Sequence, residues 1–417
     1  VMKILLVANH TCGNRGDGAI LRGIIDSLNL ARNDLDIDVI SRYPTSSGYL
    51  LQQDILPDAL FLQTKKGKNK LVDKIKRRLM PKIMMAHIAK RGVFKLFPVP
   101  QYLQEFSDNL KQYDAIIQVG GSFFVDLYGP LQFEHSLCAL LAGKPIHMIG
   151  HSVGPFQKPR FNEIANFVFD RVNSLVLRES VSLEMMKQGG ITTGKVVKGA
   201  DTAFLVRARE VAEPGHNLLH WQQVIGQQKT IAITVRELAP FDKRLGVTQQ
   251  QYEEAFGKVI NAMIARGYQV VAFSTCTGID SYNKDDRMVA MTLSDHIEQK
   301  DKYHVIMDEF NDLELGILLG QCHLTIGTRL HSAIISMNFG TPAVAINYEH
   351  KSLGVMNQLG LPEMASDVKS LMDGSIITKV NTVLDNYDAV KQQVDSAVEQ
   401  ERMLGNRITD DVVKLLG

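Results

Sequence analysis

The chain has 417 residues, of which 45% are hydrophobic, and it carries a formal net charge of +1 at pH 7. This length is sufficient for two domains, each with its own hydrophobic core. A net charge this close to zero does not mark the chain as a nucleic-acid-binding protein or as an acidic solvating protein.

The opening segment and the cysteines predict a cytoplasmic protein. The apolar run within Lys3–Ala8 is too short for a signal peptide or a membrane span, so we expect it to form a first buried strand. The four cysteines show neither a C-x-x-C pair nor zinc-ligand spacing, which predicts reduced thiols and no structural metal. They are Cys12, Cys138, Cys276 and Cys322.

Short β-branched runs alternate with longer helical patterns along the chain. Most of these runs are continuously apolar, as in parallel strands that helices cover on both faces. The first series is Lys3–Ala8, Asp36–Ser41, Ala115–Val119, Pro145–Gly150, Ser174–Leu177 and Lys195–Lys198. The second series is Thr230–Thr234, Gln269–Phe273, His304–Met307, Leu324–Gly327 and Ala343–Ile346. The predicted fold class is α/β, with two Rossmann-like domains that face each other across a cleft.

A polar stretch at 208–228, which contains Pro214-Gly215 and no strand pattern, is predicted to link the two domains. It separates an N-terminal domain, 1–207, from a C-terminal domain, 229–417. Parallel sheets of this kind bind ligands at the carboxyl ends of their strands, so polar residues just after each strand are the candidates for a site.

A basic insertion at 62–99 interrupts the first domain. It holds twelve lysines and arginines between residues 65 and 95 and a single acid, Asp73. Its apolar residues recur at helical spacing, which predicts a basic amphipathic helix or helix pair. The segment is either a solvated insertion or a surface that docks on an anionic membrane. Nucleic acid is disfavoured, because no aromatic residues are interleaved with the basic ones.

A glycine-containing loop, Asn9–Ile20, follows the first strand and leads into a helix. Free backbone N–H groups at such a helix start favour an anion, but the loop matches neither G-x-G-x-x-G nor a Walker P-loop. Asn14 and Asp17 are therefore either ligand-facing residues or parts of a tight turn in which Asp17 caps the helix.

Further polar groups follow later strands of the first domain. Gly120-Gly121, with Asp126 in the same loop, would let a ligand approach the backbone closely, although many βα turns contain paired glycines. His151-Ser152 follow the next strand. A lone histidine is more often structural, but its place at a strand end makes it a candidate.

Arg178 and Asp201 follow the last two strands of the first domain, and they either face the ligand or form a self-contained ion network.

In the second domain Arg236 and Arg329 follow two different strands, and His331 comes two residues after Arg329. Arginine is suited to bidentate recognition of carboxylates and phosphates, and a histidine at a helix start can act as acid or base near neutral pH. The pattern predicts an anion site with an acid–base group beside it. The structural alternatives are an ion pair of Arg329 with a core carboxylate such as Asp308, and a helix-cap role for His331.

Six short segments together resemble the polysaccharide pyruvyl transferase family, and most of all its colanic acid branch. The resemblance extends from Met2 to about Gly360. The segments are "GNRGDGAILRG", "IIQVGGSFFVD", "IGHSVGPF", "VLRESVS", "TVRELAPFDKR" and "IGTRLHSAI". The resemblance implies a glycosyltransferase-B-like architecture, in which C-terminal helices from about Ile376 to Leu416 can pack back on the first domain. It also implies transfer of pyruvate from phosphoenolpyruvate to a sugar as a cyclic ketal.

The resemblance also implies roles for the candidate residues. Arg236 and Arg329, with Leu330, would hold the donor, and His331 would be the catalytic acid. Asp17, Asp126 or His151 would serve as the base. The residues expected to face the acceptor sugar are Asn14, Asp17, Gly120, Gly121, His151 and Ser152. Much of the family has Gln-Gly where this chain has His151-Ser152, so either imidazole could be the essential one.

The expected partners are phosphoenolpyruvate and a lipid-linked oligosaccharide with a galactose-type residue, at the inner face of the cytoplasmic membrane. No metal, further cofactor or nucleic acid is expected, and the oligomeric state is open. Segment 65–95 would bring the enzyme to the membrane. One rival is a nucleotide-sugar glycosyltransferase of the same fold, in which Glu349 would hold the ribose. The other rival is a non-catalytic scaffold, which would not need arginines and a histidine at the strand ends.

Overall fold

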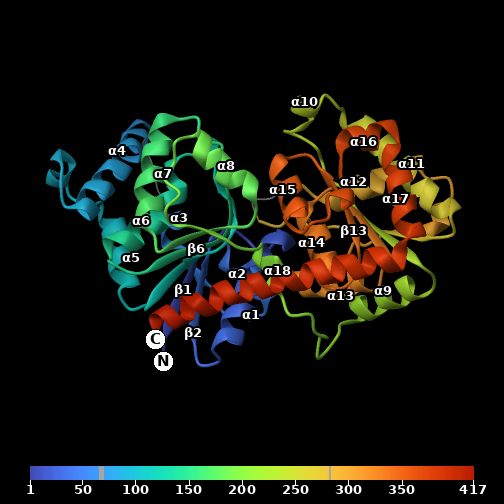
Figure 1. The fold of residues 1–417 in the computed structure, drawn as a ribbon, viewed down its shortest axis with the longest axis horizontal. Helices are drawn as coiled ribbons and strands as arrows, with labels where there is room; N and C mark the ends of the chain where they lie inside the picture. Colours follow the sequence, from blue (N-terminus) through green and yellow to red (C-terminus); the bar gives the residue numbers. More distant parts are fainter. Residues whose placement is uncertain (65–69, 281–282) are drawn as a thin grey trace. The chain divides into compact units, whose positions relative to one another are not determined.

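The computed structural model describes residues 1–64, 70–280 and 283–417, except for the side chains of residues 73 and 76. These residues divide into two units (Figure 1). The first unit consists of Val1–Thr11, Gly23–Leu205 and Leu404–Gly417, and the second of Cys12–Arg22 and Val206–Met403. The short segment Cys12–Arg22, which comes early in the chain, therefore belongs to the second unit.

The first unit is built on a parallel sheet in the order β3-β2-β1-β4-β6-β7-β8, with β5 paired to β6. Ile146–Val153 is buried at every position, as expected where helices cover both faces of a sheet. The strands are β1 (Lys3–Asn9), β2 (Asp36–Ser41), β3 (Leu56–Pro57), β4 (Ala115–Gln118), β5 (Gly121–Phe124), β6 (Ile146–Val153), β7 (Ser174–Leu177) and β8 (Val196–Lys198).

The second unit is built on a six-stranded parallel sheet in the order β11-β10-β9-β12-β13-β14. This order, in which the chain starts in the middle and winds outward both ways, is that of a Rossmann-like sheet. Its strands are β9 (Thr230–Thr234), β10 (Gln269–Phe273), β11 (Tyr303–Val305), β12 (Leu324–Gly327), β13 (Ala343–Asn347) and β14 (Ala365–Asp367).

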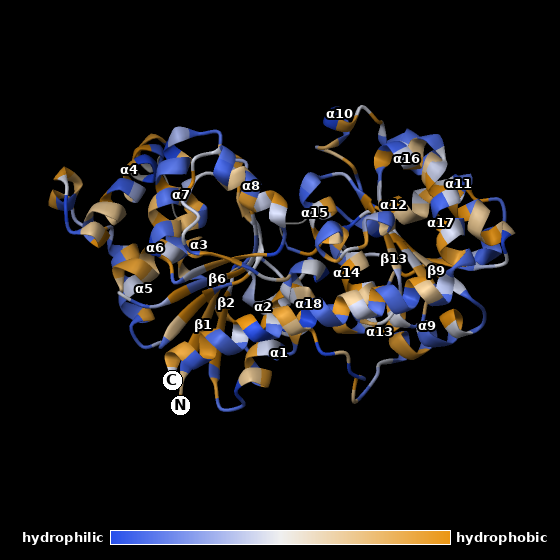
Figure 2. Ribbon diagram, viewed as in Figure 1, coloured by the Kyte–Doolittle hydropathy of each residue, from blue (hydrophilic) through white to orange (hydrophobic). Residues whose placement is uncertain are grey.

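Helices connect and cover the strands of each unit, and the strands are the more hydrophobic elements (Figure 2). Those before β9 are α1 (Arg15–Ala31), α2 (Pro44–Leu51), α3 (Ala59–Thr64), α4 (Lys70–Ala89), η1 (Val93–Leu96), α5 (Gln101–Leu110), η2 (Asp126–Tyr128), η3 (Pro130–Phe133), α6 (Glu134–Leu141), α7 (Pro159–Arg171), α8 (Ser180–Gln188), η4 (Thr202–Leu205) and α9 (His216–Gly226).

The later helices follow the same alternation with strands. They are α10 (Asp242–Leu245), α11 (Gln249–Ala265), α12 (Asp286–Thr292), η5 (Leu293–His296), η6 (Lys300–Lys302), α13 (Asp312–Gly320), α14 (Leu330–Asn338), α15 (His350–Gln358), η7 (Pro362–Met364), α16 (Val368–Asp373), α17 (Ser375–Asp385) and α18 (Tyr387–Leu416). Among the residues described, no helix combines the length and the apolar character needed to cross a membrane.

The α/β fold class with two Rossmann-like units is confirmed, and each predicted strand is present. Three short strands, β3, β5 and β14, were not predicted. The structure also differs within 208–228, where α9 occupies half of the segment predicted as a linker. Leu218, Trp221 and Ile225 recur at helical spacing and are buried, which gives this helix an apolar face.

Segment 62–99 contains the predicted helix, α4, of which only the second half is packed. Met80 and Met84 are buried, whereas Leu71 and Ile75 are exposed. Lys65, Lys66 and Lys68 of the basic segment lie outside the described residues, as do the side chains of Asp73 and Lys76.

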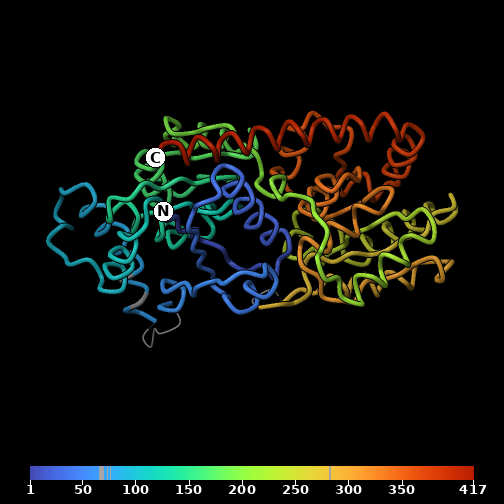
Figure 3. The backbone as a smooth tube through the Cα atoms, turned by 90° about the horizontal axis from the view of Figure 1, so that it is seen from below, coloured from blue at the N-terminus to red at the C-terminus, as the bar shows by residue number. Residues whose placement is uncertain are grey.

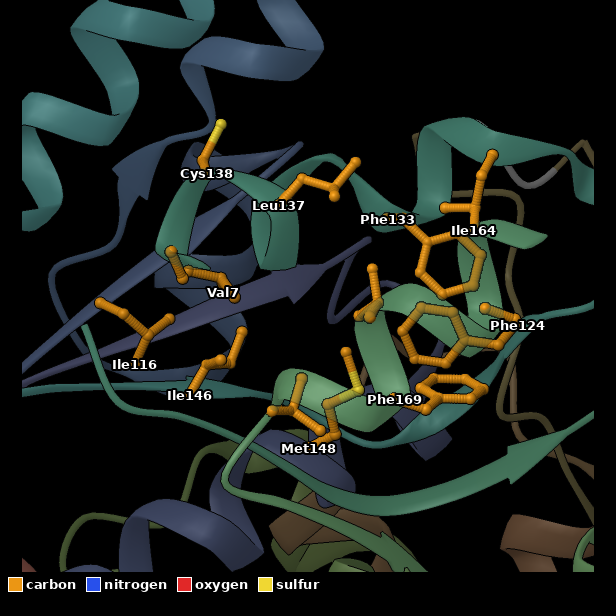
Figure 4. Close-up of a cluster of buried hydrophobic side chains, with 14 of the residues drawn as sticks. Val7, Ile116, Phe124, Phe133, Leu137, Cys138, Ile146, Met148, Ile164 and Phe169 are labelled. Atoms are coloured by element: carbon orange, nitrogen blue, oxygen red, sulfur yellow. The ribbon is translucent and has the colours of Figure 1, made fainter. Parts of the chain in front are cut away.

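The core of the first unit contains a cluster of aromatic rings (Figure 4). Phe124 of β5 stacks on Phe133 with ring centroids 4.8 Å apart and meets Phe169 edge-on at 5.5 Å. His151 of β6 lies against the ring of Phe124, with the two ring centroids 5.2 Å apart. The cluster fixes β5 and the η2–η3 loop on the edge of the sheet where β6 ends.

Both ends of the chain belong to the first unit, and the views in Figures 1 and 3 draw them near each other. Helix α18 contributes to both units, because its residues up to Met403 belong to the second and the remainder to the first. Ile408 and Val412 of its last part are buried, and Ser27 donates a 2.7 Å hydrogen bond to Asn406.

Candidate active site

Arg236 and Arg329 lie at the same edge of the second sheet. Each comes two residues after the end of its strand, β9 and β12 respectively. These strands are adjacent and parallel, and their last residues pair in register. Both guanidiniums also interact electrostatically with the Tyr348 phenol and the Asp286 carboxyl. The structure therefore brings the two predicted anion-binding arginines together.

Arg329 is held by a buried carboxylate, Asp286, at the start of α12. Its Nε donates to Asp286 Oδ2 at 2.7 Å and its Nη2 to Oδ1 at 3.0 Å. The structural alternative, an ion pair of this arginine with a core carboxylate, is thus present, but with Asp286 and not with Asp308. Asp308 instead accepts a bond from Trp221 Nε1 at 2.6 Å. Among the described residues, Nη1 of Arg329 makes no hydrogen bond, so this nitrogen can serve an anionic ligand.

Arg236 is held from another side by aromatic residues. Its Nη1 donates to the Tyr348 hydroxyl, and its guanidinium lies 4.6 Å from the centroid of that ring and 5.4 Å from the centroid of Phe241. Its Nε donates to the carbonyl oxygen of Glu237 at 3.0 Å. Burial raises the pKa of the Tyr348 phenol, so its hydroxyl stays protonated and neutral at physiological pH.

A third cation, Lys284, interacts electrostatically with Arg236 and Arg329. Its Nζ donates to the carbonyl oxygen of Ala239. Burial lowers the pKa of Lys284, and the positive charges of Arg236 and Arg329 lower it further. The three cations therefore lie near Asp286 at the carboxyl edge of the sheet, where their positive charge can stabilise an anion. The Glu237 carboxylate also interacts with Lys284.

The loop between β12 and α14 is fixed by short hydrogen bonds. Ser332 Oγ donates to the Arg329 carbonyl oxygen at 2.6 Å and lies 2.7 Å from Thr234 Oγ1. A Cβ on Gly327 would lie only 2.5 Å from Ser332 Oγ, so this position has no room for a side chain. The loop thereby presents Arg329, Leu330 and His331 at the first turn of α14.

His331 is the second residue of α14, and its half-buried side chain packs on the backbone of Gly16. A Cβ on Gly16 would lie 2.7 Å from His331 Cβ and 2.8 Å from Cγ. The same point is 3.1 Å from Asn14 Oδ1. The predicted G-N-x-G-D loop and the predicted acid are therefore direct neighbours within the second unit.

Asn14, and not Asp17, caps α1. Its Oδ1 accepts from the Gly16 N–H at 2.9 Å and from the Asp17 N–H at 3.4 Å. The alternative in which Asp17 caps this helix is therefore wrong, because Asp17 already lies inside the first turn. An acidic residue there is favoured by the positive end of the helix dipole.

Arg15 anchors this loop in the second unit. Its guanidinium is 1% exposed and donates to the carbonyl oxygens of Phe310 at 2.7 Å and Gly13 at 2.6 Å. It also bonds to Thr277 Oγ1 at 2.9 Å and to the carboxylate of Glu309. With its donors used in this way, Arg15 holds Gly16 against His331 and is not a ligand-binding group.

His151 is fully buried in the first unit and has the contacts of a core residue. Its Nε2 lies 3.1 Å from the Gln118 carbonyl oxygen, and among the described residues its Nδ1 has no hydrogen-bond partner. Burial lowers its pKa to about 4, so the ring is neutral at physiological pH. His151 and Ser152 lie within β6, which runs on to Val153.

The alternative of a self-contained network for Arg178 and Asp201 is confirmed. Arg178 donates to Asp201 Oδ2 at 2.8 Å, to Ser152 Oγ at 2.8 Å and to Ser122 Oγ at 3.1 Å. Ser152 is thus a hydrogen-bond acceptor in this buried network.

Glycine is required at position 120 by close backbone packing and at position 121 by the backbone conformation. A Cβ on Gly120 would lie 2.4 Å from the carbonyl oxygen of Gly150, and Gly121 adopts φ 151° at the start of β5. Asp126 follows in η2, where its Oδ2 accepts from the Gln157 N–H at 2.8 Å. These three residues all belong to the first unit.

The thiol at the second sheet edge is unreactive. Burial raises the pKa of Cys276 to about 11, so the thiol stays protonated at neutral pH. Within the described part of the chain, no group of three or more His, Cys, Asp or Glu side chains is placed to hold a metal ion.

The family model for "Polysaccharide pyruvyl transferase" matches residues 14–350. This range includes Asn14, Asp17, Arg236, Arg329 and His331. The chain belongs to the polysaccharide pyruvyl transferase family. It is therefore a transferase, and the predicted resemblance is confirmed.

A relative agrees with this family assignment, and solved structures agree with the fold. The chain is 80% identical over 416 residues to the amylovoran biosynthesis protein AmsJ of Erwinia amylovora, and the match covers 100% of both sequences. A glycosyltransferase from Rickettsia africae gives a TM-score of 0.59 at 13% identity, covering 100% of this chain and 98% of that one. Anabaena HepE in complex with UDP-glucose gives 0.57 at 12% identity, covering 99% and 100%. At these identities the two structures show the fold alone, which is of the glycosyltransferase-B type.

Sequence reasoning missed three residues at the candidate site of this pyruvyl transferase, namely Tyr348, Asp286 and Lys284. Tyr348 follows β13 directly, so the strand-end rule could have found it. Asp286 and Lys284 come more than ten residues after β10, and no sequence pattern connects them with Arg329.

Proposed function

We propose that this pyruvyl transferase moves the enolpyruvyl group of phosphoenolpyruvate onto a galactose-type residue of an exopolysaccharide repeat unit, as a cyclic ketal. The observation that carries the proposal is the convergence of Arg236 and Arg329, with His331 two residues further, at the edge of the second sheet. Phosphoenolpyruvate is a small dense anion with a carboxylate and a phosphate, and bidentate arginine sites suit both groups.

The proposed reaction needs an acid and a field of positive charge. Protonation of the methylene carbon of the donor creates an oxocarbenium-like centre, which a first sugar hydroxyl attacks. A second hydroxyl then displaces the phosphate and closes the ketal. The two hydroxyl protons are balanced by the new methyl C–H and by the proton that leaves on the phosphate. No cofactor or metal takes part in this scheme.

In this scheme the candidate site residues of the second unit have distinct roles. Arg236 and Arg329 bind the donor and stabilise the charge on the departing phosphate. His331 supplies the proton to carbon, a step for which a positioned acid contributes roughly 10²–10⁴-fold. Asp17 lies in the first turn of α1, next to Gly16, which packs on His331, and this makes it our choice for the base that takes the hydroxyl proton. The buried, neutral His151 is less suited to that task.

The proposal for the acceptor is supported by a relative of the chain. The protein that is 80% identical bears a name from amylovoran biosynthesis, and the sequence resembles the colanic acid branch. We therefore propose an acceptor from polymers of this kind, carried on a lipid at the inner face of the cytoplasmic membrane. Segment 65–95 would make the peripheral contact with anionic lipid.

A thermal-shift comparison of phosphoenolpyruvate with UDP-glucose tests the donor. At about 100 times its Kd, a ligand adds about 2.7 kcal/mol to the free energy of unfolding. We expect phosphoenolpyruvate to raise Tm in the wild type but not in Arg329→Met/Asp286→Asn, which removes the cation without leaving a buried charge. A shift with UDP-glucose alone would replace the proposal with the nucleotide-sugar alternative.

A further inference from the structure

A groove of about 660 Å³ lies in the first unit, where α4 and the start of α7 face each other across the η2–η3 loop. Figure 1 draws these two helices in the same part of that unit. The α4 residues in its wall follow Lys74 by three, four, seven, eight and eleven positions, so they share one face of the helix. The groove is thus a built feature of two helices and a loop.

The rim of the groove is strongly cationic. Six of its lining residues are basic, and two, Asp126 and Glu163, are acidic. In the part of the chain that the structure describes, none of the six pairs with a carboxylate within 4.0 Å, although Lys82 Nζ lies 5.4 Å from the centroid of the Phe94 ring. The six are Lys74, Arg77, Arg78, Lys82, Lys158 and Arg160.

The floor of the groove is apolar. Met85 from α4 and Phe161 and Ile164 from α7 line it, and all three also pack into the core of the unit. Since they belong to the core, the floor is rigid and cannot close over the groove without disturbing that packing. An occupant must therefore offer hydrocarbon to the floor and negative charge to the rim.

Large hydrophobic side chains are exposed on the elements around this groove. Leu127, which lines it, is 75% exposed, and Leu96 of η1 is 83% exposed. Others on α4, η1 and η2 are also exposed, namely Leu71, Val72, Ile75, Val93 and Tyr128. Exposed apolar side chains beside a cationic rim are typical of surfaces that sit at a bilayer interface.

We propose that this groove binds an anionic phospholipid at the membrane surface, with the phosphate among the rim cations and the start of an acyl chain on the apolar floor. The proposal narrows the membrane contact proposed for segment 65–95 to one face of α4 and adds a second wall, Lys158 and Arg160 of the α7 start, from outside that segment. It does not depend on the identity of the donor or the acceptor.

Vesicle flotation with the purified full chain tests this. We compare phosphatidylcholine vesicles with matched vesicles that also contain phosphatidylglycerol, and wild type with Arg77→Ala/Arg78→Ala/Arg160→Ala. The expected result is binding to the anionic vesicles only, reduced on the order of 100-fold in this variant. The matched control, Lys195→Ala/Lys198→Ala/Lys258→Ala, removes the same charge from exposed positions outside the groove and is expected to bind like wild type.

Three outcomes would overturn the proposal. They are the absence of wild-type binding to anionic vesicles, an equal loss in the groove variant and the control, and stabilisation of the protein by inorganic phosphate without vesicle binding. The last would assign the groove to a soluble phosphate. Unchanged melting temperatures of both variants establish that they are folded. Since no sugar or phosphoenolpyruvate enters the assay, its failure is separate from a failure of the proposed reaction.

Discussion

Gly16 is the residue on which the position of His331 depends most directly. A methyl group at Gly16 would overlap His331 Cβ and Cγ, so Gly16→Ala must displace the imidazole. A displacement of about 1 Å at a catalytic group can cost on the order of 100-fold in rate. We therefore expect Gly16→Ala to fold but to lose turnover by about that factor, as measured by phosphate release.

Gly18→Ala is the matched control, because it lies in the same helix and its new methyl group would meet only Cys12 at 3.5 Å, an ordinary contact. We expect it to keep the wild-type rate. If Gly16→Ala were as active as Gly18→Ala, the proposed role of His331 would be contradicted.

His151 predicts a pH dependence of stability. Burial lowers its pKa from 6.5 to about 4 in the folded state, so between these values the unfolded state binds more protons. The free energy of unfolding therefore falls as the pH is lowered through this range, by up to about 3 kcal/mol from this group. Urea unfolding of His151→Gln is expected to show a shallower fall in the free energy of unfolding than wild type. Parallel curves would show that His151 is not buried in its neutral form.

Candidate site residues could be predicted from the sequence where they directly follow the end of a strand. The position of Arg236, Arg329 and His331 at one edge of the sheet was predicted in this way, because the carboxyl ends of parallel strands lie at the same edge. Asp286 could not be found, since its proximity to Arg329 depends on the path of the chain after β10. The burial of His151 could not be predicted either, because β6 continues for three residues beyond the predicted end of the strand.

At the scale of elements, the long apolar runs determined the strands, while short or polar strands escaped prediction. β3 is only two residues long and is exposed, so it carries almost no hydrophobic signal. α9 was missed because it directly follows Pro214-Gly215 in a polar stretch, which favoured a linker although Leu218, Trp221 and Ile225 recur at helical spacing. Cys12–Arg22 belongs to the second unit through contacts with partners that are far away in the sequence. These are the side-chain bonds of Arg15 and Arg22 and the backbone bond from the Arg15 N–H to the Thr275 carbonyl oxygen at 2.9 Å.

Arg22 and Asp312 form a buried ion pair that joins α1 to α13, with Nε 2.9 and 3.1 Å from the two carboxylate oxygens. Arg22→Met leaves Asp312 buried and unpaired, which is expected to cost about 3–5 kcal/mol in the free energy of unfolding. The double variant Arg22→Met/Asp312→Leu is expected to recover most of this loss, because no uncompensated charge remains. Chemical denaturation checks both, and additive losses in the double variant would contradict the pairing.

At the scale of the whole molecule, the α/β class and the two Rossmann-like units followed from the alternation of strand and helix patterns. The exact division of the chain between the two units could not be predicted, because α1 and α18 each contribute residues to both units. Such sharing rests on contacts between segments that are distant in the chain, and hydrophobic periodicity records only local structure. The same fold occurs in proteins with many different activities, so the reaction is determined by the residues at the strand ends and not by the fold.

One measurement tests the central claim most directly. The purified protein is mixed with phosphoenolpyruvate and a galactoside that carries a chromophore on a short lipid anchor, and the products are followed by mass spectrometry and phosphate release. We expect a product heavier by one pyruvyl ketal, formed in step with phosphate. In His331→Gln the rate should fall roughly 10²–10⁴-fold while phosphoenolpyruvate still raises Tm. Ketal formation at the wild-type rate in His331→Gln, or consumption of a UDP-sugar in place of phosphoenolpyruvate, would contradict the account.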